Sequence, residues 1–564
     1  MITLGISCFY HDSAACLVRD GEVIAAAQEE RFNRIKNTDV FPIEAINFCV
    51  QKAGIGFHQI DRVVWFEKPY LKFSRVLTAH LDVFPLGLSS FVRSMPKWLS
   101  ERLFVPMLLE EKIDFRGELL FLRHHLSHAA SAYYPSGFDE AAIIVADGVG
   151  EWATFSTGTA RGHEIKLEKE IHYPHSLGLL YTTFTTFLGF HANGGEGKLM
   201  GLAGLGKPVY LPQLKKMVHV FPDGSFLLNP EFFQFLGKER SWTKKFTGLL
   251  GEPRKKDEVF SARHYDLAAS IQALLEEIMI LNVKLIHQRT GLTKLCLAGG
   301  VALNCVANAK ILEETGIEEI FVQPAAGDAG AALGSALYYD LTVRKLPRGK
   351  QTHSFYGPEY SHSQIIKALK QKNLSYEEFS EDELLERTAQ LLKENNVVGW
   401  FQGALEFGPR ALGHRSILAN PTFAGIKEVI NDRVKKRESF RPYAPIVTFE
   451  DVEKYFDFNS ESPFMLLAPR MNDIGKKTLP GIVHADGTAR VQTCTQSSDP
   501  LMWKLLKKFE VISRVPVLIN TSFNSREEPV VNTPEQAVAC YLRSSMDALV
   551  LGNCLVMKKS SDGR

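Results

Sequence analysis

The sequence predicts an α/β protein whose N-terminal part contains one structural unit twice. Residues 2–27 read as three short strands, and Asp20-Gly21, a typical hairpin dipeptide, joins the last two. Three strands followed by a helix occur again further along the chain, at 141–146, 152–157, 166–171 and 179–188. With 564 residues the chain is too long for one ordinary core, so we expect two or more domains.

The first strand of each repeat leads into a polar loop that carries an acid. Asp12 follows the strand over 2–7, and Asp147 follows the strand over 141–146. A duplicated unit of this kind places the two loops face to face across a central cleft. At the level of fold, this layout is analogous to the actin and sugar-kinase superfamily.

The composition is that of a soluble globular protein, with 45% hydrophobic and 23% charged residues. Lys and Arg number 65 against 64 Asp and Glu, so no net charge attracts nucleic acid or a membrane surface. The start of the chain resembles a strand rather than a leader, and no apolar run approaches the roughly 20 residues that span a bilayer. Eight scattered cysteines without a Cys-x-x-Cys pair suit reduced thiols. We expect a cytoplasmic protein with neither a membrane nor a nucleic-acid partner.

Three segments of the first half allow two interpretations each. Tyr10-His11-Asp12-Ser13 is either an ordinary turn or a substrate loop in which His11 acts as an acid or base. Residues 28–36 are densely charged and form either a solvated face or a strand end that presents basic side chains to a cleft. Residues 70–118 are rich in Phe and Leu without a clear period, and we interpret them as an inserted helical lid or substrate-facing region.

A group of histidines suggests a metal site. His124 and His128 lie at i,i+4, which on a helix places their Cβ atoms about 5–6 Å apart. His125 and His128, at i,i+3, share a face equally well, so periodicity does not choose the pair. Asp147 ends a buried strand and can complete the ligand set. The alternative is that the histidines cap or pack a helix.

Two glycine-rich stretches and one acid complete the first domain. Lys198 lies in the dense glycine run 194–203. Glycines let a ligand approach the backbone closely, and the lysine can bind an anion as a point charge. Gly299-Gly300 follows a strand and leads through Asn304 into a helix, a pattern typical of a nucleotide site and also of a tight turn. Asp328 stands at a helix entrance, either as an N-cap or as a fourth metal ligand.

A second domain follows a polar, basic linker near 344–350 and begins with a helix over 382–393 and a strand over 397–401. Its cations are too many for one neutral substrate and suit a polyanion such as a triphosphate; a solvated basic face is the alternative. They are Arg410, Arg415, Lys435, Arg437 and Arg441. A strand over 515–519 ends in Asn520-Thr521-Ser522.

Together the motifs resemble those of the ATP-dependent O-carbamoyltransferases that modify nodulation factors and antibiotics of the tobramycin and cephamycin type. The match runs over essentially the whole chain. The motifs are Tyr10-His11-Asp12-Ser13-Ala14-Ala15, Glu29-Glu30-Arg31-Phe32, His124-His125-Leu126-Ser127-His128-Ala129, Met200-Gly201-Leu202-Ala203, Ala298-Gly299-Gly300-Val301-Ala302-Leu303-Asn304, Glu406-Phe407-Gly408-Pro409-Arg410-Ala411-Leu412-Gly413, Arg441-Pro442-Tyr443-Ala444-Pro445 and Asn520-Thr521-Ser522-Phe523-Asn524.

The resemblance implies a domain organisation. Residues 1–345 would form an actin-like carbamoyl-transfer domain similar to the threonylcarbamoyl-transfer enzymes. Residues 346–362 would be a linker, and 363–564 a YrdC-like α/β domain. The family chemistry is the formation of carbamoyl adenylate from ATP and carbamoyl phosphate in the C-terminal domain. The carbamoyl group then passes to a hydroxyl of a small natural product or sugar in the N-terminal domain, with release of AMP.

The resemblance also assigns roles to residues. The metal ligands would be His124, His128, Asp147 and Asp328, with Fe²⁺ as the ion. ATP, with Mg²⁺, and carbamoyl phosphate would bind at Arg410, Lys435, Arg441, Asn520 and Ser522. His11 and Asp12 would be catalytic at the acceptor hydroxyl. The adenylate would bind in the N-terminal domain at Lys198, Gly299, Gly300 and Asn304.

Other functions remain as alternatives. An actin-fold small-molecule kinase has no use for the second basic cluster. A tRNA threonylcarbamoyl-type modification is disfavoured by the balanced charge. A hydrogenase-maturation carbamoyltransferase would require zinc-type cysteine pairs, and a non-catalytic nucleotide-binding module is the last alternative. The oligomeric state stays open, with a homodimer as one option.

Overall fold

The computed structural model describes residues 1–85, 87–236, 240–438 and 440–558. It divides into two compact units, the first made of residues 1–29 and 37–351. The second unit comprises residues 30–36 and everything from Thr352 onward. The division at 351/352 falls inside the segment expected as a linker, whereas the assignment of 30–36 to the second unit was not expected.

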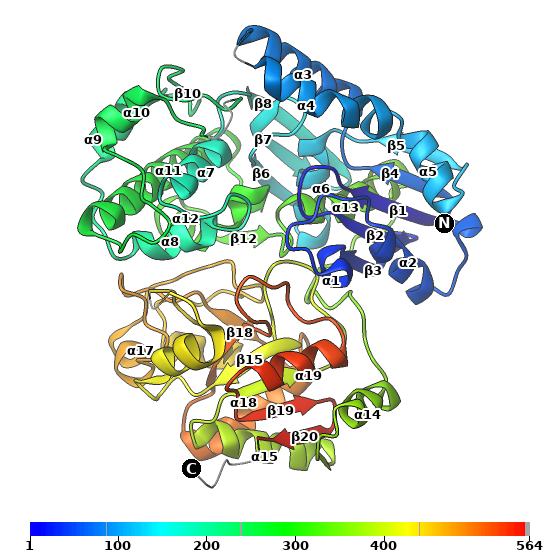
Figure 1. The fold of residues 1–564 in the computed structure, drawn as a ribbon, viewed down its shortest axis with the longest axis vertical. Helices are drawn as coiled ribbons and strands as arrows, with labels where there is room; N and C mark the ends of the chain where they lie inside the picture. Colours follow the sequence, from blue (N-terminus) through cyan, green and yellow to red (C-terminus); the bar gives the residue numbers. More distant parts are fainter. Residues whose placement is uncertain (86, 237–239, 439, 559–564) are drawn as a thin grey trace. The chain divides into compact units, whose positions relative to one another are not determined.

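The first unit contains two five-stranded sheets with the same strand order, β3-β2-β1-β4-β5 and β8-β7-β6-β11-β12 (Figure 1). In each sheet the first strand, β1 or β6, pairs antiparallel with one neighbour and parallel with the other. The strands of the first sheet are β1 (Ile2–Ser7), β2 (Ala14–Arg19), β3 (Glu22–Gln28), β4 (Arg62–Trp65) and β5 (Glu118–Phe121). Those of the second are β6 (Glu140–Ala146), β7 (Ala153–Arg161), β8 (Glu164–His172), β11 (Lys294–Ala298) and β12 (Glu319–Val322). The repeated order confirms the duplicated actin-like, sugar-kinase-like class.

Two helices lie between the sheets and connect the repeats. α6 (His124–Ser136) follows the last strand of the first sheet and packs on β6 and β11 of the second. α13 (Asp328–Tyr338) follows the last strand of the second sheet and packs on β1 and β2 of the first. The two helices also pack tightly on each other: a Cβ on Gly334 would lie 1.9 Å from the Ser127 carbonyl oxygen. Only glycine permits this approach, which fixes the two helix starts relative to each other.

The segment after β4 is helical, as predicted for residues 70–118. It contains α3 (Pro69–Asp82), α4 (Leu88–Lys97), the π-helix η2 (Trp98–Arg102) and α5 (Val105–Ile113). The sequence did not predict β5, which begins at Glu118 and completes the first sheet. Two further elements of the first repeat are α2 (Ile43–Lys52) and η1 (Phe57–Gln59).

The glycine run 194–203, interpreted as a ligand loop, is in fact mostly a helix, α8 (Glu196–Ala203). Leu199, Leu202 and Ala203 are buried on one side of it, at the spacing that a packed helix requires. α8 packs on α11 (Ala262–Thr290), which corresponds to the predicted long amphipathic helix. The remaining elements of this repeat are α7 (Leu177–Phe187), α9 (Leu211–Met217), β9 (Val218–Val220), β10 (Phe226–Leu228), α10 (Lys244–Leu250), η3 (Gly300–Leu303), α12 (Cys305–Glu314) and η4 (Tyr339–Val343).

The second unit is built on one mixed eight-stranded sheet, in the order β13-β20-β19-β14-β15-β18-β16-β17. Neighbouring residues alternate between two hydrophobic cores: Trp400 and Leu518 belong to one, Phe401 and Ile519 to the other. This period of two covers both faces of the sheet and confirms the predicted α/β class of the second unit. The strands are β13 (Glu377–Glu378), β14 (Val398–Phe401), β15 (Arg415–Ala419), β16 (Ala444–Thr448), β17 (Gln492–Cys494), β18 (Val517–Ser522), β19 (Ala548–Leu551) and β20 (Cys554–Met557).

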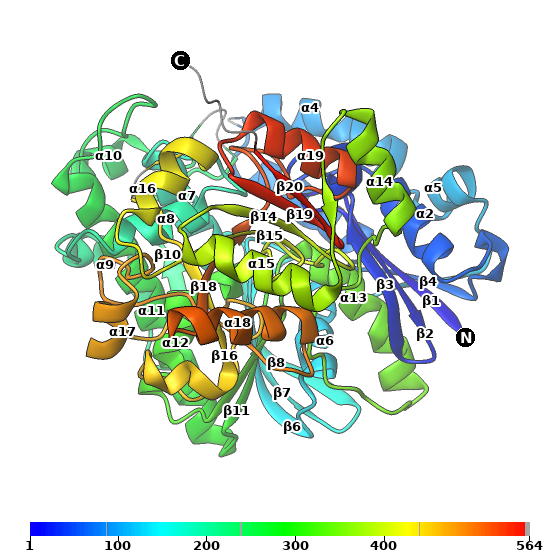
Figure 2. The same ribbon diagram turned by 90° about the horizontal axis from the view of Figure 1, so that it is seen from below.

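Helix pairs cover the two faces of this sheet. α15 (Glu381–Lys393) packs with α18 (Pro500–Ser513), and Figure 2 shows both across the strands. α14 (His362–Gln371) packs with α19 (Pro534–Arg543) on the other core. The shorter helices are α1 (Glu30–Asn33), α16 (Ile426–Glu428), η5 (Val429–Lys435), η6 (Phe449–Lys454) and α17 (Asp473–Thr478). Among the described helices, none has the length and apolar character to cross a membrane.

Candidate functional site

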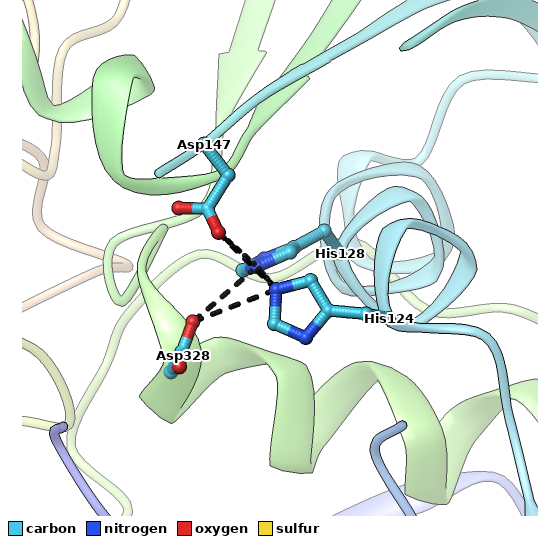
Figure 3. Close-up of side chains that lie close together, drawn as sticks. All are labelled: His124, His128, Asp147 and Asp328. Atoms are coloured by element: carbon cyan, nitrogen blue, oxygen red, sulfur yellow. Dashed lines mark hydrogen bonds and ion pairs between the residues drawn. The ribbon is translucent and has the colours of Figure 1, made fainter. Parts of the chain in front are cut away.

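Four predicted metal ligands meet in the first unit (Figure 3). His124 and His128 lie one turn apart on α6, Asp147 directly follows β6, and Asp328 is the first residue of α13. One donor atom from each of the four lies within 4.8 Å of all the others. His125 points elsewhere, with its Nδ1 2.6 Å from the Ser156 hydroxyl. The structure therefore brings His124 and His128 together in the cluster, a choice of pair that helical periodicity left open.

The nitrogen and oxygen atoms of the cluster are close and buried. His124 Nε2 lies 3.1 Å from His128 Nε2 and 3.2 Å from Asp147 Oδ2. Both Nε2 atoms lie 3.7 Å from Asp328 Oδ1. None of the four side chains is more than 4% exposed. Two imidazole nitrogens that face each other beside two carboxylates form a set of donors typical of a divalent cation site.

The electrostatics of the cluster fit such a cation. Burial opposes a charged imidazole, but the hydrogen bond that His124 donates to Asp147 and the charge of Asp328 raise the pKa of His124 to about 9. Burial likewise opposes a charged Asp147, but His124 and His128 hold the pKa of its carboxyl well below the usual range. Within the described part of the chain, neither oxygen of Asp328 has a hydrogen-bond donor. A buried carboxylate without a donor is costly, and a bound cation removes that cost.

Further polar groups hold the ligands, and the sequence did not indicate two of them. Asp147 Oδ1 accepts a hydrogen bond from the Gly300 amide at 2.9 Å. The Glu151 carboxylate accepts from the His124 amide at 3.0 Å, and Glu67 Oε2 lies 4.0 Å from His124 Nδ1. Glu67 follows β4 by two residues, and a buried acid just after a strand is the same signal that identified Asp147. Such outer partners fix the orientation of metal ligands.

The predicted adenylate residues have different positions. The Gly300 amide is used by Asp147, and Gly299 has a φ of 89°, which brings it against Ala146. Asn304 caps α12 by accepting from the Ala307 amide, at 3.1 Å, and it pairs with Gln272 on α11. Lys198 lies on α8, with its Nζ 5.8 Å from the centre of the Phe190 ring. The glycine pair therefore contributes to holding a metal ligand.

His11 and Asp12 form a bonded pair in the loop after β1. His11 Nδ1 lies 3.0 Å from Asp12 Oδ2, and Asn37 donates to Asp12 Oδ1 at 2.7 Å. Burial lowers the pKa of His11, but the charges of Asp328, Asp12 and Asp147 outweigh it and raise this pKa to about 10. Because the charges of Asp328 and Asp147 raise its pKa, His11 interacts electrostatically with the acidic cluster.

In the second unit, Lys435 is buried at the end of η5 among oxygen atoms. Its ammonium group donates to Asn524 Oδ1 at 2.8 Å and to the Asn524 carbonyl at 3.0 Å, and also to the Ser522 carbonyl. The Ser522 hydroxyl donates to Asn524 Oδ1 at 2.7 Å. Burial, together with the charges of neighbouring arginines, holds the pKa of Lys435 well below its usual value. A negative ligand would stabilise this ammonium group.

Arg441 belongs to the same cationic cluster. Burial and the charges of Arg437 and Arg490 lower its pKa to about 10. The sequence did not single out Arg490, which precedes β17 by two residues. Asn520 donates to Gln492 Oε1 at 2.8 Å, and its buried Oδ1 has no donor among the described residues. The cluster thus combines several cations with a free amide oxygen.

Arg415, which we grouped with these cations, has a structural role instead. Its buried guanidinium donates to the carbonyls of Gln402 at 2.5 Å, Gly403 at 3.0 Å and Pro358 at 3.1 Å. It also lies 3.7 Å from the centre of the Phe401 ring. These partners occupy both terminal nitrogens of the guanidinium, so Arg415 supports the backbone and does not present these two groups to a polyanion. A basic residue in a strand-forming run gives no sequence signal that separates the two roles.

Arg410 lies in a loop that Glu406 shapes. Glu406 Oε1 accepts from the amides of Leu412 at 2.8 Å, His414 at 2.9 Å and Arg415 at 3.1 Å. These three bonds fold the loop around one carboxylate oxygen and hold its half-buried Arg410. The segment 406–413 therefore has a defined shape.

Comparisons with known proteins agree with this arrangement. Residues 2–337 match the family model for the carbamoyltransferase N-terminus, and residues 389–558 match that for the carbamoyltransferase C-terminus. The chain is 42% identical to the uncharacterized protein sll1178 of Synechocystis, over 100% of this chain and 97% of that protein. It is 36% identical to the nodulation protein NolNO of Sinorhizobium fredii, over 98% of this chain and 80% of that protein.

A shorter match concerns a relative whose name states an activity. The chain is 34% identical to the 3'-hydroxymethylcephem-O-carbamoyltransferase of Amycolatopsis lactamdurans, over 45% of this chain and 47% of that protein. Both family models together cover the two units. The chain therefore belongs to the carbamoyltransferase family and is an enzyme that transfers carbamoyl groups.

Proposed function

We propose that the enzyme is an O-carbamoyltransferase with two chemically distinct sites. In the second unit, water cleaves carbamoyl phosphate to phosphate and carbamate, and the carbamate then attacks the α-phosphorus of ATP to form carbamoyl adenylate with release of pyrophosphate. In the first unit, the carbamoyl group passes to a hydroxyl of a small molecule, and AMP leaves. The observation that carries this proposal is the contrast between the sites: a buried acidic and imidazole cluster in one unit, and a buried cationic cluster in the other.

The cationic cluster suits the activation step. Arg410, Lys435 and Arg441 would bind the phosphate groups of ATP and carbamoyl phosphate, because fixed positive charge stabilises the charge that develops on a leaving phosphate. Asn520 Oδ1, which lacks a donor within the described residues, is suited to accept a hydrogen bond from the carbamoyl NH₂ group. Ser522 would orient the same group. Mg²⁺ would accompany ATP.

The acidic cluster suits the transfer step. His124, His128, Asp147 and Asp328 would hold a divalent cation, and two imidazoles with carboxylates favour Fe²⁺. Such a cation, when bound, supplies a Lewis acid that polarises the carbamoyl carbonyl. Lys198, Asn304 and the Gly299-Gly300 turn would bind the adenylate beside it.

His11, held by Asp12, would accept the proton of the acceptor hydroxyl. Its pKa of about 10 reflects the charges of Asp328 and Asp147 as well as that of Asp12. A bound cation would neutralise the charges of Asp328 and Asp147. The pKa of His11 would then fall towards the neutral range, where a histidine serves as a general base. The proton would then remain on His11 while AMP leaves.

The nature of the ATP products tests the proposal. The iron-loaded enzyme is incubated with ATP and labelled carbamoyl phosphate, and nucleotides and pyrophosphate are separated. We expect pyrophosphate that depends on carbamoyl phosphate, followed by AMP and a labelled carbamate once a hydroxyl acceptor is present. Release of ADP would instead indicate a kinase, and labelling of tRNA alone would indicate a nucleic-acid modification.

A further inference from the structure

Arg75, on the helical segment after β4, is a buried cation without a matching partner. Its side chain belongs to α3 and is 8% exposed. Among the described residues it makes no hydrogen bond or ion pair, and its Nε is buried without an acceptor. Its single aromatic contact places the guanidinium carbon 5.3 Å from the centre of the Tyr173 ring. Buried guanidinium groups are ordinarily hydrogen-bonded, so a missing partner points to a ligand.

The position of Arg75 relates it to the acidic cluster. Lys72 lies one turn earlier on the same face of α3, and its Nζ is 2.5 Å from Glu67 Oε2. The same Nζ lies 5.2 Å from the centre of the Tyr10 ring. Glu67 in turn lies 4.0 Å from His124 Nδ1. This face of α3 is therefore directed towards the metal ligands.

The nearby acids act on Arg75 through their charge, but each is hydrogen-bonded to other groups and none forms a described ion pair with it. Glu67 is paired with Lys72 at 2.5 Å. Glu151 accepts from the amides of His124 at 3.0 Å and Lys68 at 2.9 Å. Tyr10 and Tyr173 are phenols, and burial raises the pKa of both, so they stay neutral. A guanidinium stays charged at any physiological pH, so the hydrogen-bond donors of Arg75 remain suited to an anionic ligand.

We infer that Arg75 binds an anionic group, such as a carboxylate, phosphate or sulfate, carried by the acceptor molecule. The acceptor hydroxyl would then face the metal ligands while its charge meets Arg75, with the half-buried Tyr10 and Tyr173 alongside. This inference rests on the proposed transfer reaction. Arg75 acts here in binding and determines which acceptors are used: anionic ones over neutral and cationic ones.

The adenylate phosphate is the other anion in the reaction, and the geometry favours the acceptor over it. His124 directs Nε2 towards Asp147 and Asp328 and Nδ1 towards Glu67. An adenylate bound at the cation lies on the Nε2 side. Glu67 and the Lys72–Arg75 face of α3 lie on the Nδ1 side. A molecule that reaches from the cluster to Arg75 must extend to the Nδ1 side of His124, which an adenylate held at the cation need not do.

Pairs of compounds that differ by one anionic group test the inference. The probes are glucose and glucose 6-phosphate, galactose and galacturonate, and glucitol and gluconate. Calorimetry measures their binding to the iron-loaded full-length enzyme, and labelled carbamoyl phosphate with ATP measures transfer. We expect at least one anionic member to bind about 10- to 100-fold more tightly than its neutral counterpart, the range for a charged hydrogen-bonded pair.

Substitutions test whether Arg75 causes the tighter binding of the anionic compounds. In Arg75→Gln the ratio of affinities should fall to about one, and Arg75→Lys should retain part of it. Arg93→Gln, at an exposed position of α4, should leave the ratio unchanged. Carbamoyl-phosphate-dependent pyrophosphate release and the thermal unfolding midpoint report whether each variant is folded. If Arg75→Gln does not fold, Arg75→Lys provides the comparison.

Three outcomes would overturn the inference. One is that no anionic probe binds better than its neutral counterpart. Another is a preference that survives Arg75→Gln. The third is a weaker affinity for AMP in Arg75→Gln with an unchanged acceptor ratio, which would assign Arg75 to the nucleotide. Absence of pyrophosphate in the wild type would contradict the proposed function instead, while the calorimetric ratios would still report on Arg75.

Discussion

Lys435 shows how one buried side chain can define a reaction site. Three oxygen acceptors from Ser522 and Asn524 hold its ammonium group, while burial and the surrounding arginines disfavour its charge. Such an arrangement is stable with a phosphate nearby, because the ligand compensates the like charges. Lys435 is therefore expected to act in the activation step alone.

Replacement of Lys435 should separate the two half-reactions. In Lys435→Ala, carbamoyl-phosphate-dependent pyrophosphate release should fall by about 10²- to 10³-fold, the range for loss of one preorganised charge-stabilising donor. Transfer from supplied carbamoyl adenylate should persist. Lys367→Ala, at an exposed position of α14, is the matched control and should keep both activities. Loss of both steps in Lys435→Ala would contradict two separate sites.

His128 should show the opposite behaviour. His128→Ala removes one of four donors, so metal content after gel filtration should fall at least 10-fold and transfer should fall with it. Pyrophosphate release should continue, because the activation site lies in the other unit. His125→Gln is the control on the same helix, since His125 contacts Ser156 instead. A normal metal content in His128→Ala, measured by mass spectrometry, would exclude the chelate.

At the scale of single elements, the turn between β11 and η3 links backbone shape to the metal ligands. Gly299 has a φ of 89°, and a Cβ there would lie 2.3 Å from the Ala146 carbonyl oxygen. The next residue, Gly300, donates its amide to Asp147 Oδ1. A shift of this turn should therefore displace Asp147, a predicted metal ligand.

Gly299→Ala should lower the thermal unfolding midpoint and weaken metal binding together. The strained φ costs about 1 kcal/mol and the backbone overlap adds to it, so we expect a loss of about 2–4 kcal/mol. Gly54→Ala is the control, because Gly54 also has a positive φ, 66°, with open space around it. It should lose only the strain contribution and keep its metal affinity. Equal effects of the two substitutions would mean that the close approach to Ala146 has no consequence.

The sequence predicted those elements whose apolar period was undisturbed. All strands of the two five-stranded sheets except β5 follow simple patterns and were identified, and so were α11 and α15. The helix α8 was missed because glycines interrupt its first turn, although its buried Leu199 and Leu202 have helical spacing. β5 was missed because its four residues are only partly buried, so no alternation marks them.

The site could be predicted only where spacing or position carries information. Asp147 follows a buried strand, and a histidine pair at helical spacing precedes it. The choice of His124 over His125 depends on which side of α6 faces α13, and this is a property of the packed helices. Glu151 contacts His124, and Arg490 acts on Arg441, across long sequence separations. The packing that brings these residues together leaves no local pattern in the sequence.

At the scale of the whole molecule, the chain does not divide at one point. Residues 30–36 belong to the second unit. Arg31 donates to the Gly408 carbonyl at 2.7 Å, and Arg34 donates to the carbonyls of Val530 at 2.6 Å and Pro529 at 2.7 Å. A piece of the first repeat thus supports the loop that carries Arg410.

Arg34→Ala should destabilise the second unit selectively. Loss of its charged hydrogen bonds should remove about 1.5–3 kcal/mol of stability from that unit. Hydrogen exchange should show faster exchange around residues 528–543, with unchanged protection in α6 and β6. Arg93→Ala, at an exposed position of the first unit, should change neither region. Faster exchange confined to the first unit would show that 30–36 does not stabilise the second.

The two helices between the sheets have a consequence for the ancestry of the enzyme. α6 and α13 are equivalent elements, since each follows the last strand of its sheet, and each begins with a predicted metal ligand, His124 or Asp328. The two helix starts meet at the cluster, one contributed by each repeat. An ancestor with a single repeat would have had to pair with itself to bring two such helix starts together, and both would then have carried the same residue. In one fused chain the two helix starts can carry different residues, here a histidine and an aspartate, so the predicted mixed ligand set is one that two identical copies could not present.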